Sequence, residues 1–318
     1  MVAGGLLSAI DWRWVFFAPV LVASAILVAA IRLIPDSGRP ERSAGGFDLP
    51  GAVTVTGGML LLVVAVVQSS EMAAGWTVAA LAGSAALLAA FAAIERRTAA
   101  PLLRLGLLRS APLVRANLGI MLFIGAFVAF QFVAVLYMQE LRGWSALETG
   151  LALIVVGIDA ILAPTVTPRL VERFGTVPVI LAGMIAAAVA YALFLPLGAD
   201  WTYAAMLPTL LLAGVAFSLA FGALTIAATD GVAEEDQGVA GGLVAMSLQF
   251  GAAVGLAIAA AVNVAATADG SPEAMLDGYR AALVVPVVAA ALGAVVTLPG
   301  LRKPARFSLS TTPASEAD

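Results

Sequence analysis

Nine apolar stretches, most of them long enough to cross a lipid bilayer as a helix, occupy nearly all of this 318-residue chain. A hydrocarbon core about 30 Å thick is crossed by roughly 20 apolar residues in an α-helix. Hydrophobic residues make up 62% of the sequence and charged residues only 11%, which is far from the balance of a soluble globular protein. The sequence therefore predicts an all-α integral membrane protein.

The expected spans are all helices, because an open strand in lipid would leave its backbone polar groups unpaired. They cover residues 14–34, 49–69, 75–94, 113–137, 147–167, 176–197, 202–228, 238–262 and 279–299. Turn-forming and charged residues mark the loops between them, including 140–145, 168–175 and 230–237. The tail over 300–318 is polar and rich in Ser and Thr, and we expect it to be disordered.

The positions of Arg and Lys predict how the spans are threaded. If the first span runs from outside to inside, the inner side receives thirteen of the 16 basic residues and the outer side three. The inner set is Arg32, Arg39, Arg42, Arg96, Arg97, Arg104, Arg109, Arg115, Arg169, Arg173, Arg302, Lys303 and Arg306, and the outer set is Arg13, Arg142 and Arg280. We therefore expect a multi-pass protein of the cell (cytoplasmic) membrane with its C-terminus in the cytoplasm.

This threading places Met1 outside, with no basic residue before the first span to hold it there. An odd number of preceding spans would remove the difficulty. We therefore interpret the chain as the C-terminal part of a longer protein, or as a truncated gene product.

The chain contains no histidine and no cysteine. This removes imidazole bases, metal sites built on those residues, thiolate nucleophiles and disulfides. Intramembrane peptidases of the Ser–His and zinc types need histidine, and lipid-transferring enzymes commonly use paired aspartates near a membrane face, which are absent. We expect no enzyme, no metal and no cofactor. The arginines are dispersed and the pI is near 4.9, which argues against a nucleic-acid partner.

Six short motifs follow one another along the chain. The first pairs Gly4-Gly5-Leu6-Leu7 with Trp12-Arg13-Trp14-Val15-Phe16-Phe17, and the second is Phe47-Asp48-Leu49-Pro50-Gly51-Ala52. The third runs through Glu95-Arg96-Arg97, Pro101-Leu102-Leu103, Leu107-Leu108-Arg109 and Ala116-Asn117-Leu118, and the fourth comprises Gln139, Gly143, Ser145, Glu148 and Gly150. The fifth is Arg169-Leu170-Val171-Glu172-Arg173-Phe174-Gly175, and the sixth is Ala240-Gly241-Gly242-Leu243 with Ser247-Leu248-Gln249-Phe250-Gly251 and Gly255. In order and spacing they resemble the fourteen-span drug:proton antiporters of the major facilitator superfamily.

The resemblance implies a major facilitator fold that lacks its first five spans. Residues 1–34 would hold the last span of the N-terminal half, 35–112 two extra central spans and an inner linker, 113–299 the six-span C-terminal half, and 300–318 a cytoplasmic tail. Within 113–299, two groups of three spans enter from opposite sides, as in inverted-repeat transporters whose sites lie near the midplane.

The function implied is proton-coupled efflux of amphipathic or cationic drug-like compounds. The partners would be a small-molecule substrate, the lipid bilayer, a proton gradient and a missing N-terminal half. Two alternatives stay open: a non-transporting membrane scaffold or remnant, and a carrier of this superfamily for another small solute.

Asp159 is the most informative single residue, because it lies among apolar neighbours within the expected span 147–167. An isolated ionised carboxylate there costs about 2.5 kcal/mol or more on insertion scales. It should therefore face a polar cavity, find a partner or stay protonated. One interpretation is cation recognition or proton carriage, and the other is a carboxyl group that is hydrogen-bonded to a neighbouring helix.

Three amides are further candidates for a substrate or ion pathway. Asn117 and Gln131 fall on the same side of one expected helix, so they either line a common polar stripe or bond to other helices. Gln249 lies on a small-residue stripe of the span 238–262, where packing competes with a pathway role.

That same span carries two glycine pairs at a spacing of four, Gly238 with Gly242 and Gly251 with Gly255. This spacing lets a neighbouring helix approach closely. The pairs lie on roughly opposite faces of the helix, so we expect neighbours to pack against it from both sides.

The fifth motif is similar to the superfamily's inner gating loop, G-x-L-x-D-R-x-G-x-R. Here Glu172 stands in place of its aspartate and Val177 in place of its second basic residue. Arg169, Glu172 and Arg173, followed by Gly175, would form a salt link that holds one conformation and breaks in the other.

Overall fold

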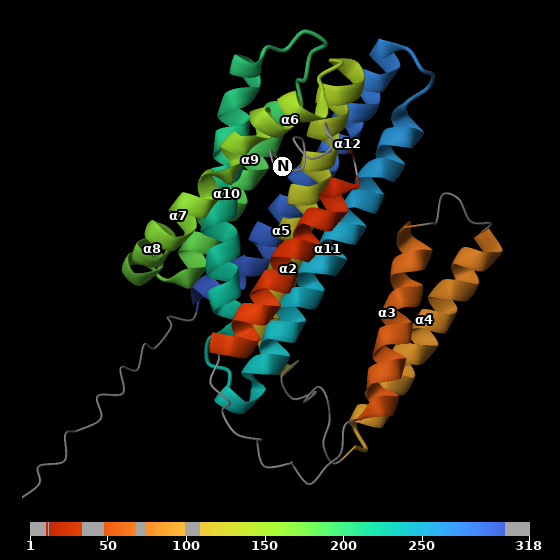
Figure 1. The fold of residues 1–318 in the computed structure, drawn as a ribbon, viewed down its shortest axis with the longest axis vertical. Coiled ribbons are helices and arrows are strands. Elements are labelled where there is room, and N and C mark those ends of the chain that lie inside the picture. The colour runs from red at the N-terminus through yellow and green to blue at the C-terminus, as the bar shows by residue number, and fades with distance from the viewer. Residues whose placement is uncertain (1–10, 12, 34–47, 68–73, 99–108, 303–318) are drawn as a thin grey trace, which may run out of the picture.

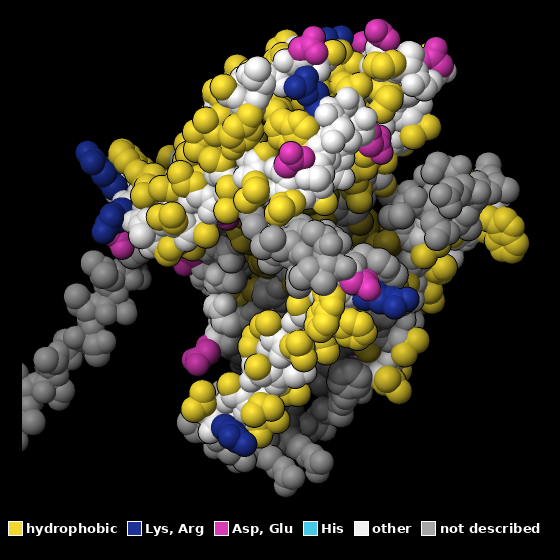
Figure 2. Space-filling model, turned by 45° about the horizontal axis from the view of Figure 1, so that its top comes forward, with side chains coloured by type: hydrophobic (Ala, Val, Ile, Leu, Met, Phe, Trp, Pro, Cys, Tyr) yellow, Lys and Arg dark blue, Asp and Glu magenta, His cyan; other side chains and the backbone are white. Residues whose placement is uncertain are grey.

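The computed structural model of the protein describes residues 11, 13–33, 48–67, 74–98 and 109–302. Within these ranges eight helices are long and apolar enough to cross a membrane, and a shorter apolar helix covers Leu49–Ala65. The described residues contain helices and turns but no strand, as the hydropathy pattern predicted. Hydrophobic side chains cover most of the described surface visible in Figure 2, with few charged groups among them. A surface of this kind requires an apolar surrounding.

Several expectations lie outside the described residues. They concern the first glycine motif at Gly4 and Gly5, the linker over 34–47, the segment 99–108 and the tail from 303 to 318.

The first three helices are α2 (Trp14–Leu33), α3 (Leu49–Val67) and α4 (Ala74–Glu95). Helix α2 has no buried residue. Helices α3 and α4 pack as a hairpin beside α11, and their ends on the Asp48 side come together in Figure 1. The hairpin is joined by the Ser84 hydroxyl, which donates to the Gly58 carbonyl at 2.8 Å.

The start of α3 explains the second sequence motif. The Gly51 N–H donates to Asp48 Oδ1 at 2.9 Å, which caps the helix. A Cβ on Gly51 would lie 2.5 Å from Asp48 Oδ2, so only glycine leaves room for the folded-back carboxylate. The pattern Asp-x-x-Gly is therefore a helix start at this position.

Six membrane-crossing segments form the main bundle (Figure 1). They are α5 (Ala111–Leu136) with the π-helical turn η2 (Tyr137–Leu141), the segment α6 (Ala146–Leu153)–η3 (Ile154–Ile158)–α7 (Asp159–Thr165), α9 (Thr176–Phe194), α10 (Tyr203–Thr229), α11 (Gln237–Ala266) and α12 (Pro272–Thr297). Short pieces connect or extend them: α8 (Thr167–Phe174), η4 (Glu234–Asp236) and η5 (Leu298–Arg302). Helix α10 packs on α9, α11 on α5, and α12 on both α5 and α9.

Aromatic side chains from α5 and α9 fill the centre of this bundle. Phe130 stacks on Tyr191 with ring centroids 4.8 Å apart, and Phe194 meets Phe130 edge-on at 5.4 Å. All three are fully buried. Such pairs add about 0.5–1.5 kcal/mol beyond the area that they bury.

Three expectations about element boundaries were wrong. The segment 168–175, expected to be a loop, contains α8, which ends at Gly175 with a φ of +85°. The span 147–167 is three helical pieces instead of one helix. The last span begins at Pro272 instead of 279, because the Ser271 hydroxyl accepts from the Ala274 N–H at 3.3 Å and proline suits the first helical turn.

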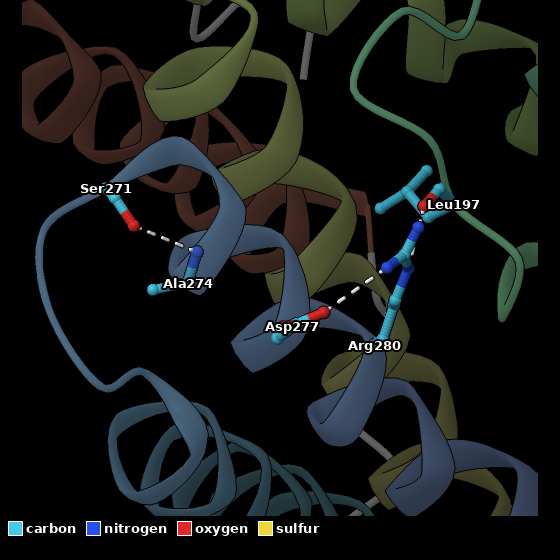
Figure 3. Close-up of polar contacts among 5 residues, drawn as sticks. All are labelled: Leu197, Ser271, Ala274, Asp277 and Arg280. Carbon is cyan, nitrogen blue, oxygen red and sulfur yellow. Dashed lines mark hydrogen bonds and ion pairs between the residues drawn. The ribbon is translucent and has the colours of Figure 1, made fainter.

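The bundle has two ends, which we call the Ser145 end and the Gly175 end after residues of their loops. At the Ser145 end, three consecutive carbonyls after α9 are held by side chains of other elements. Arg280 Nε donates to Leu197 O at 2.9 Å, Tyr137 Oη to Gly198 O at 2.8 Å, and Arg142 Nη1 to Ala199 O at 2.6 Å. Figure 3 shows Arg280 reaching from α12 to Leu197, with Asp277 beside it. The Gly175 end lies opposite, where α8 joins α9.

Candidate functional site

The second span of the bundle is interrupted at its centre, and we call α6, η3 and α7 together the broken span. The 3₁₀ segment Ile154–Ile158 separates the two α-helical pieces, and Asp159 is the first residue of α7. A 3₁₀ stretch inside a helix often marks a hinge or a functional site.

A pocket of about 320 Å³ lies against this interruption. Its walls come from α5, the broken span and α10, and its lining residues are Phe127, Gln131, Leu153, Ile154, Val156, Gly157, Asp159 and Phe217. The structure thus brings Asp159 and Gln131 into one cavity, although they are 28 positions apart in the sequence. This is a largely apolar site with a few polar groups, the usual form of a small-molecule pocket.

The Asp159 side chain is half-buried in the pocket wall. Among the described residues its carboxylate has no hydrogen-bond or ion-pair partner. The sequence predicted that this acid would face a cavity, find a partner or stay protonated, and the structure places it in the lining of a pocket. The alternative, a carboxyl group bonded to a neighbouring helix, finds no such bond in the described part of the chain.

The aromatic walls of the pocket were missed in the sequence analysis. Phe127 on α5 and Phe217 on α10 lie with ring centroids 4.7 Å apart, and Phe123 and Phe221 extend the cluster at 5.6 and 5.2 Å from Phe217. The available signal was the spacing of four between Phe123 and Phe127, and again between Phe217 and Phe221, which places each pair on one helix face.

Asn117 does not share the pocket with Gln131. Its Oδ1 accepts from the Ser247 hydroxyl of α11 at 3.0 Å, and its Nδ2 donates to the Leu113 carbonyl at 3.0 Å. Asn117 therefore joins α5 to α11. This is the interhelical alternative left open for the two amides, and the common stripe is not formed.

The two glycine pairs of α11 differ. Cβ atoms on Gly251 and Gly255 would overlap the backbone of Met121 and Gly125 on α5, so this pair is in direct backbone contact. Cβ atoms on Gly238 and Gly242 would meet no described atom within 4 Å. The expectation of neighbours on both sides is therefore corrected for the described residues: α5 packs on one pair, and the other faces open space. Gln249 is also exposed, so it is not a packing contact here.

The gating motif lies on the exposed helix α8 at the Gly175 end. No ion pair joins Arg169, Glu172 and Arg173 within this described segment, so the expected salt link is absent from this conformation. Arg173 instead lies over the Phe174 ring, 5.1 Å from its centroid. An exposed pair gains only about 0–1 kcal/mol, which is too little to hold these side chains together.

A second cavity of about 340 Å³ lies at the Gly175 end, between α5, α9, α10 and α12. Arg115, Thr176, Asp230 and Thr297 supply its polar groups. Val177 also lines this cavity, so its wall is apolar at the position where the family's gating motif has a basic residue. It does not adjoin Asp159 or Gln131.

The arrangement around Asp159 can bind an organic cation. A carboxylate supplies the countercharge, two phenylalanine faces accept a cation or an apolar body, and Gln131 offers a hydrogen-bonding amide. Among the described residues no group of three or more metal-ligating side chains occurs.

Comparison with known proteins adds the family context. A sequence family described as the Major Facilitator Superfamily matches residues 1–256. The lincomycin resistance protein of Streptomyces lincolnensis is 31% identical over 266 residues, covering 81% of this chain and 55% of that protein. The tetracenomycin C resistance and export protein of Streptomyces glaucescens is 29% identical over 262 residues, covering 81% of this chain and 48% of that protein. The chain thus spans about half the length of the curated relatives that it matches.

Among solved structures, the nucleoside transporter NupG (D323A mutant) is similar with a TM-score of 0.50. The match has 14% sequence identity and covers 77% of this chain and 65% of the transporter. At this identity the likeness concerns the fold alone.

Proposed function

This chain belongs to the Major Facilitator Superfamily, and we propose that it is part of a proton-coupled efflux transporter for amphipathic, often cationic compounds. The superfamily's members named among its relatives are resistance and export proteins, which supports a transporter rather than an enzyme. The sequence motifs support the finer proposal of the fourteen-span drug:proton antiporters. The chain is a multi-pass membrane protein, and we propose the cell membrane as its location, with the C-terminus in the cytoplasm.

The observation that carries the proposal is the Asp159 carboxylate in an otherwise apolar pocket at a broken helix. Burial of an amphipathic body against phenylalanine rings accounts for broad recognition, and one carboxylate favours positive charge. Proton uptake at the same carboxylate would release the cation, which would couple proton entry directly to export of the cation.

We also propose that a preceding set of spans completes the transporter. The length comparison supports this, because the relatives are about twice as long as the part that matches. Alternating access would rock the six-span bundle against these spans around the pocket. The reading frame upstream of Met1 in the genome tests this part: five further encoded spans would support it, and a non-coding region would favour a scaffold or a remnant.

The transport proposal is tested by ethidium efflux from cells that lack their own efflux pumps, with any upstream spans included in the expressed protein. We expect efflux that a protonophore abolishes. Replacement of Asp159 by asparagine keeps the shape but removes the charge and the titrating proton, so we expect a loss of about tenfold or more in rate, corresponding to about 1.4 kcal/mol.

The matched control for this variant is Asp200→Asn. It makes the same chemical change on a fully exposed loop side chain, and we expect less than about a twofold change in rate. Full protonophore-sensitive efflux by the Asp159→Asn variant would contradict the assignment of the pocket.

A further inference from the structure

Helix α10 contacts each of the three pieces of the broken span and also the start of α8, which follows α7. The Tyr203 hydroxyl donates to the carbonyl of Ala152 near the end of α6 at 3.1 Å. Gly214 lies against η3, where a Cβ would be 2.5 Å from the Val156 carbonyl oxygen. Beyond α7, Ser218 Oγ lies 2.9 Å from Thr167 Oγ1, at the start of α8. The interruption is therefore supported from one side along its whole length.

The supporting residues share one face of α10. Tyr203 and Gly214 are three helical turns apart, and Gly214 and Ser218 are one turn apart. Phe217, which lines the pocket, belongs to the same stretch of the helix. The face of α10 that holds the interruption in place is thus continuous with the pocket wall.

Helix α10 is also fixed from its other side. Gly183 of α9 lies so close to it that a Cβ there would be 2.5 Å from the Ala220 backbone nitrogen and 2.8 Å from the Ala220 Cβ. Backbone contacts of this kind cannot yield by a change of rotamer. A side chain added at Gly214 would therefore displace η3, because α10 has no room to retreat toward α9.

We propose that Gly214 is a positioning residue for Asp159. Its missing side chain lets η3 lie directly on α10, and this depth sets where Asp159 enters the pocket. Val156 and Ile158, the two residues that a Cβ on Gly214 would strike, come three positions and one position before Asp159. Binding groups must be held within about 0.5 Å of their working geometry, so a small displacement of η3 would be felt at the carboxylate.

The inference rests on the proposed role of the pocket in binding cations, and binding of tetraphenylphosphonium to the purified protein, with any upstream spans included, tests both. We expect Gly214→Ala and Asp159→Asn each to raise the Kd about tenfold. The double variant should bind no more than about twofold more weakly than Asp159→Asn alone, because Gly214 acts through that carboxylate. The control Gly222→Ala, on the same helix, adds a Cβ at an ordinary 3.4 Å from Thr167 Cγ2, and its Kd should stay within about twofold of the parent.

Two outcomes of the binding experiment would overturn the inference. One is unchanged affinity in Gly214→Ala. The other is additive losses, about a hundredfold in the double variant, which would mean that Gly214 acts through general packing.

A second readout does not depend on binding. The chain has no cysteine, so Gly157→Cys provides a single thiol in the pocket lining, at a position where a Cβ meets nothing within 4 Å. We expect Gly214→Ala to change the rate of its reaction with a positively charged methanethiosulfonate by about fivefold or more, and Gly222→Ala to leave the rate unchanged. An unchanged rate in Gly214→Ala would contradict the positioning role.

If Gly214→Ala does not yield folded protein, Tyr203→Phe is the milder variant, because it removes only the hydrogen bond to Ala152. We expect a change of about two- to threefold in the same rate, and no change would overturn the inference. Failure of the parent chain to bind tetraphenylphosphonium would instead count against the proposed function, while the thiol rates would still decide the role of Gly214.

Discussion

The contact between α5 and α11 and the contact between α10 and the broken span are both built on glycine, yet only the second leaves a pocket. On α11, Gly251 and Gly255 lie against the backbone of Met121 and Gly125. On α10, Gly214 lies against the Val156 carbonyl. The difference is the regularity of the partner. Two uninterrupted helices pack along their length, whereas the broken span lies on α10 at Gly214 and borders, with α5 and α10, the 320 Å³ pocket beside its 3₁₀ segment.

This comparison shows that small residues by themselves do not define a site in a membrane protein. They permit close approach, and the partner helix decides whether that approach gives dense packing or a cavity. The carboxylate of Asp159 lies at the contact between α10 and the broken span, where the partner helix is interrupted.

The largest expected effect comes from filling the dense contact. Gly255→Leu places a branched side chain against the Gly125 backbone, so we expect a loss of more than about 3 kcal/mol and little folded protein. Gly242→Leu makes the same change on the open pair of the same helix, where we expect a cost within about 0.5 kcal/mol. The yield and melting temperature of monodisperse protein in detergent measure both. Equal tolerance of leucine at both positions would remove the distinction between the two pairs.

A smaller effect separates two buried tyrosines, Tyr137 of η2 and Tyr191 of α9. The Tyr137 hydroxyl donates to Gly198 O at 2.8 Å, whereas the buried Tyr191 hydroxyl has no partner among the described residues. Tyr137→Phe should therefore cost about 1 kcal/mol, and Tyr191→Phe should be neutral or stabilise by up to about 1 kcal/mol. Thermal unfolding of the two variants under one condition compares them. A greater loss in Tyr191→Phe would show that its hydroxyl is paired after all.

The sequence predicted the spans well, because the mean hydropathy of a helix indicates whether that helix can lie in a lipid bilayer. The same averaging hides the interruption, since Ile154, Val155 and Val156 are as apolar in a 3₁₀ segment as in an α-helix. The early start of α12 could have been found, because Ser271, Pro272 and Glu273 form a recognisable helix start.

The site was predictable only in part. An acid among apolar residues identified Asp159, but nothing in the sequence links it to Gln131 or to the phenylalanines of α5 and α10, which are brought to it by tertiary packing. The two glycine pairs have the same spacing, so the sequence does not reveal which one meets a neighbour. Likewise, the partner of Asn117 is Ser247, 130 positions away.

The most direct test of the account is to locate a bound cation in the chain. A photoreactive amphipathic cation would be crosslinked to the purified protein, and the modified peptides would be identified by mass spectrometry. We predict adducts on the pocket segments 127–131, 153–159 and around Phe217, which a non-reactive cation competes away and Asp159→Asn reduces. Competed adducts confined to the open Gly238–Gly242 face of α11 or to the cavity at the Gly175 end, with none in the pocket, would contradict the account.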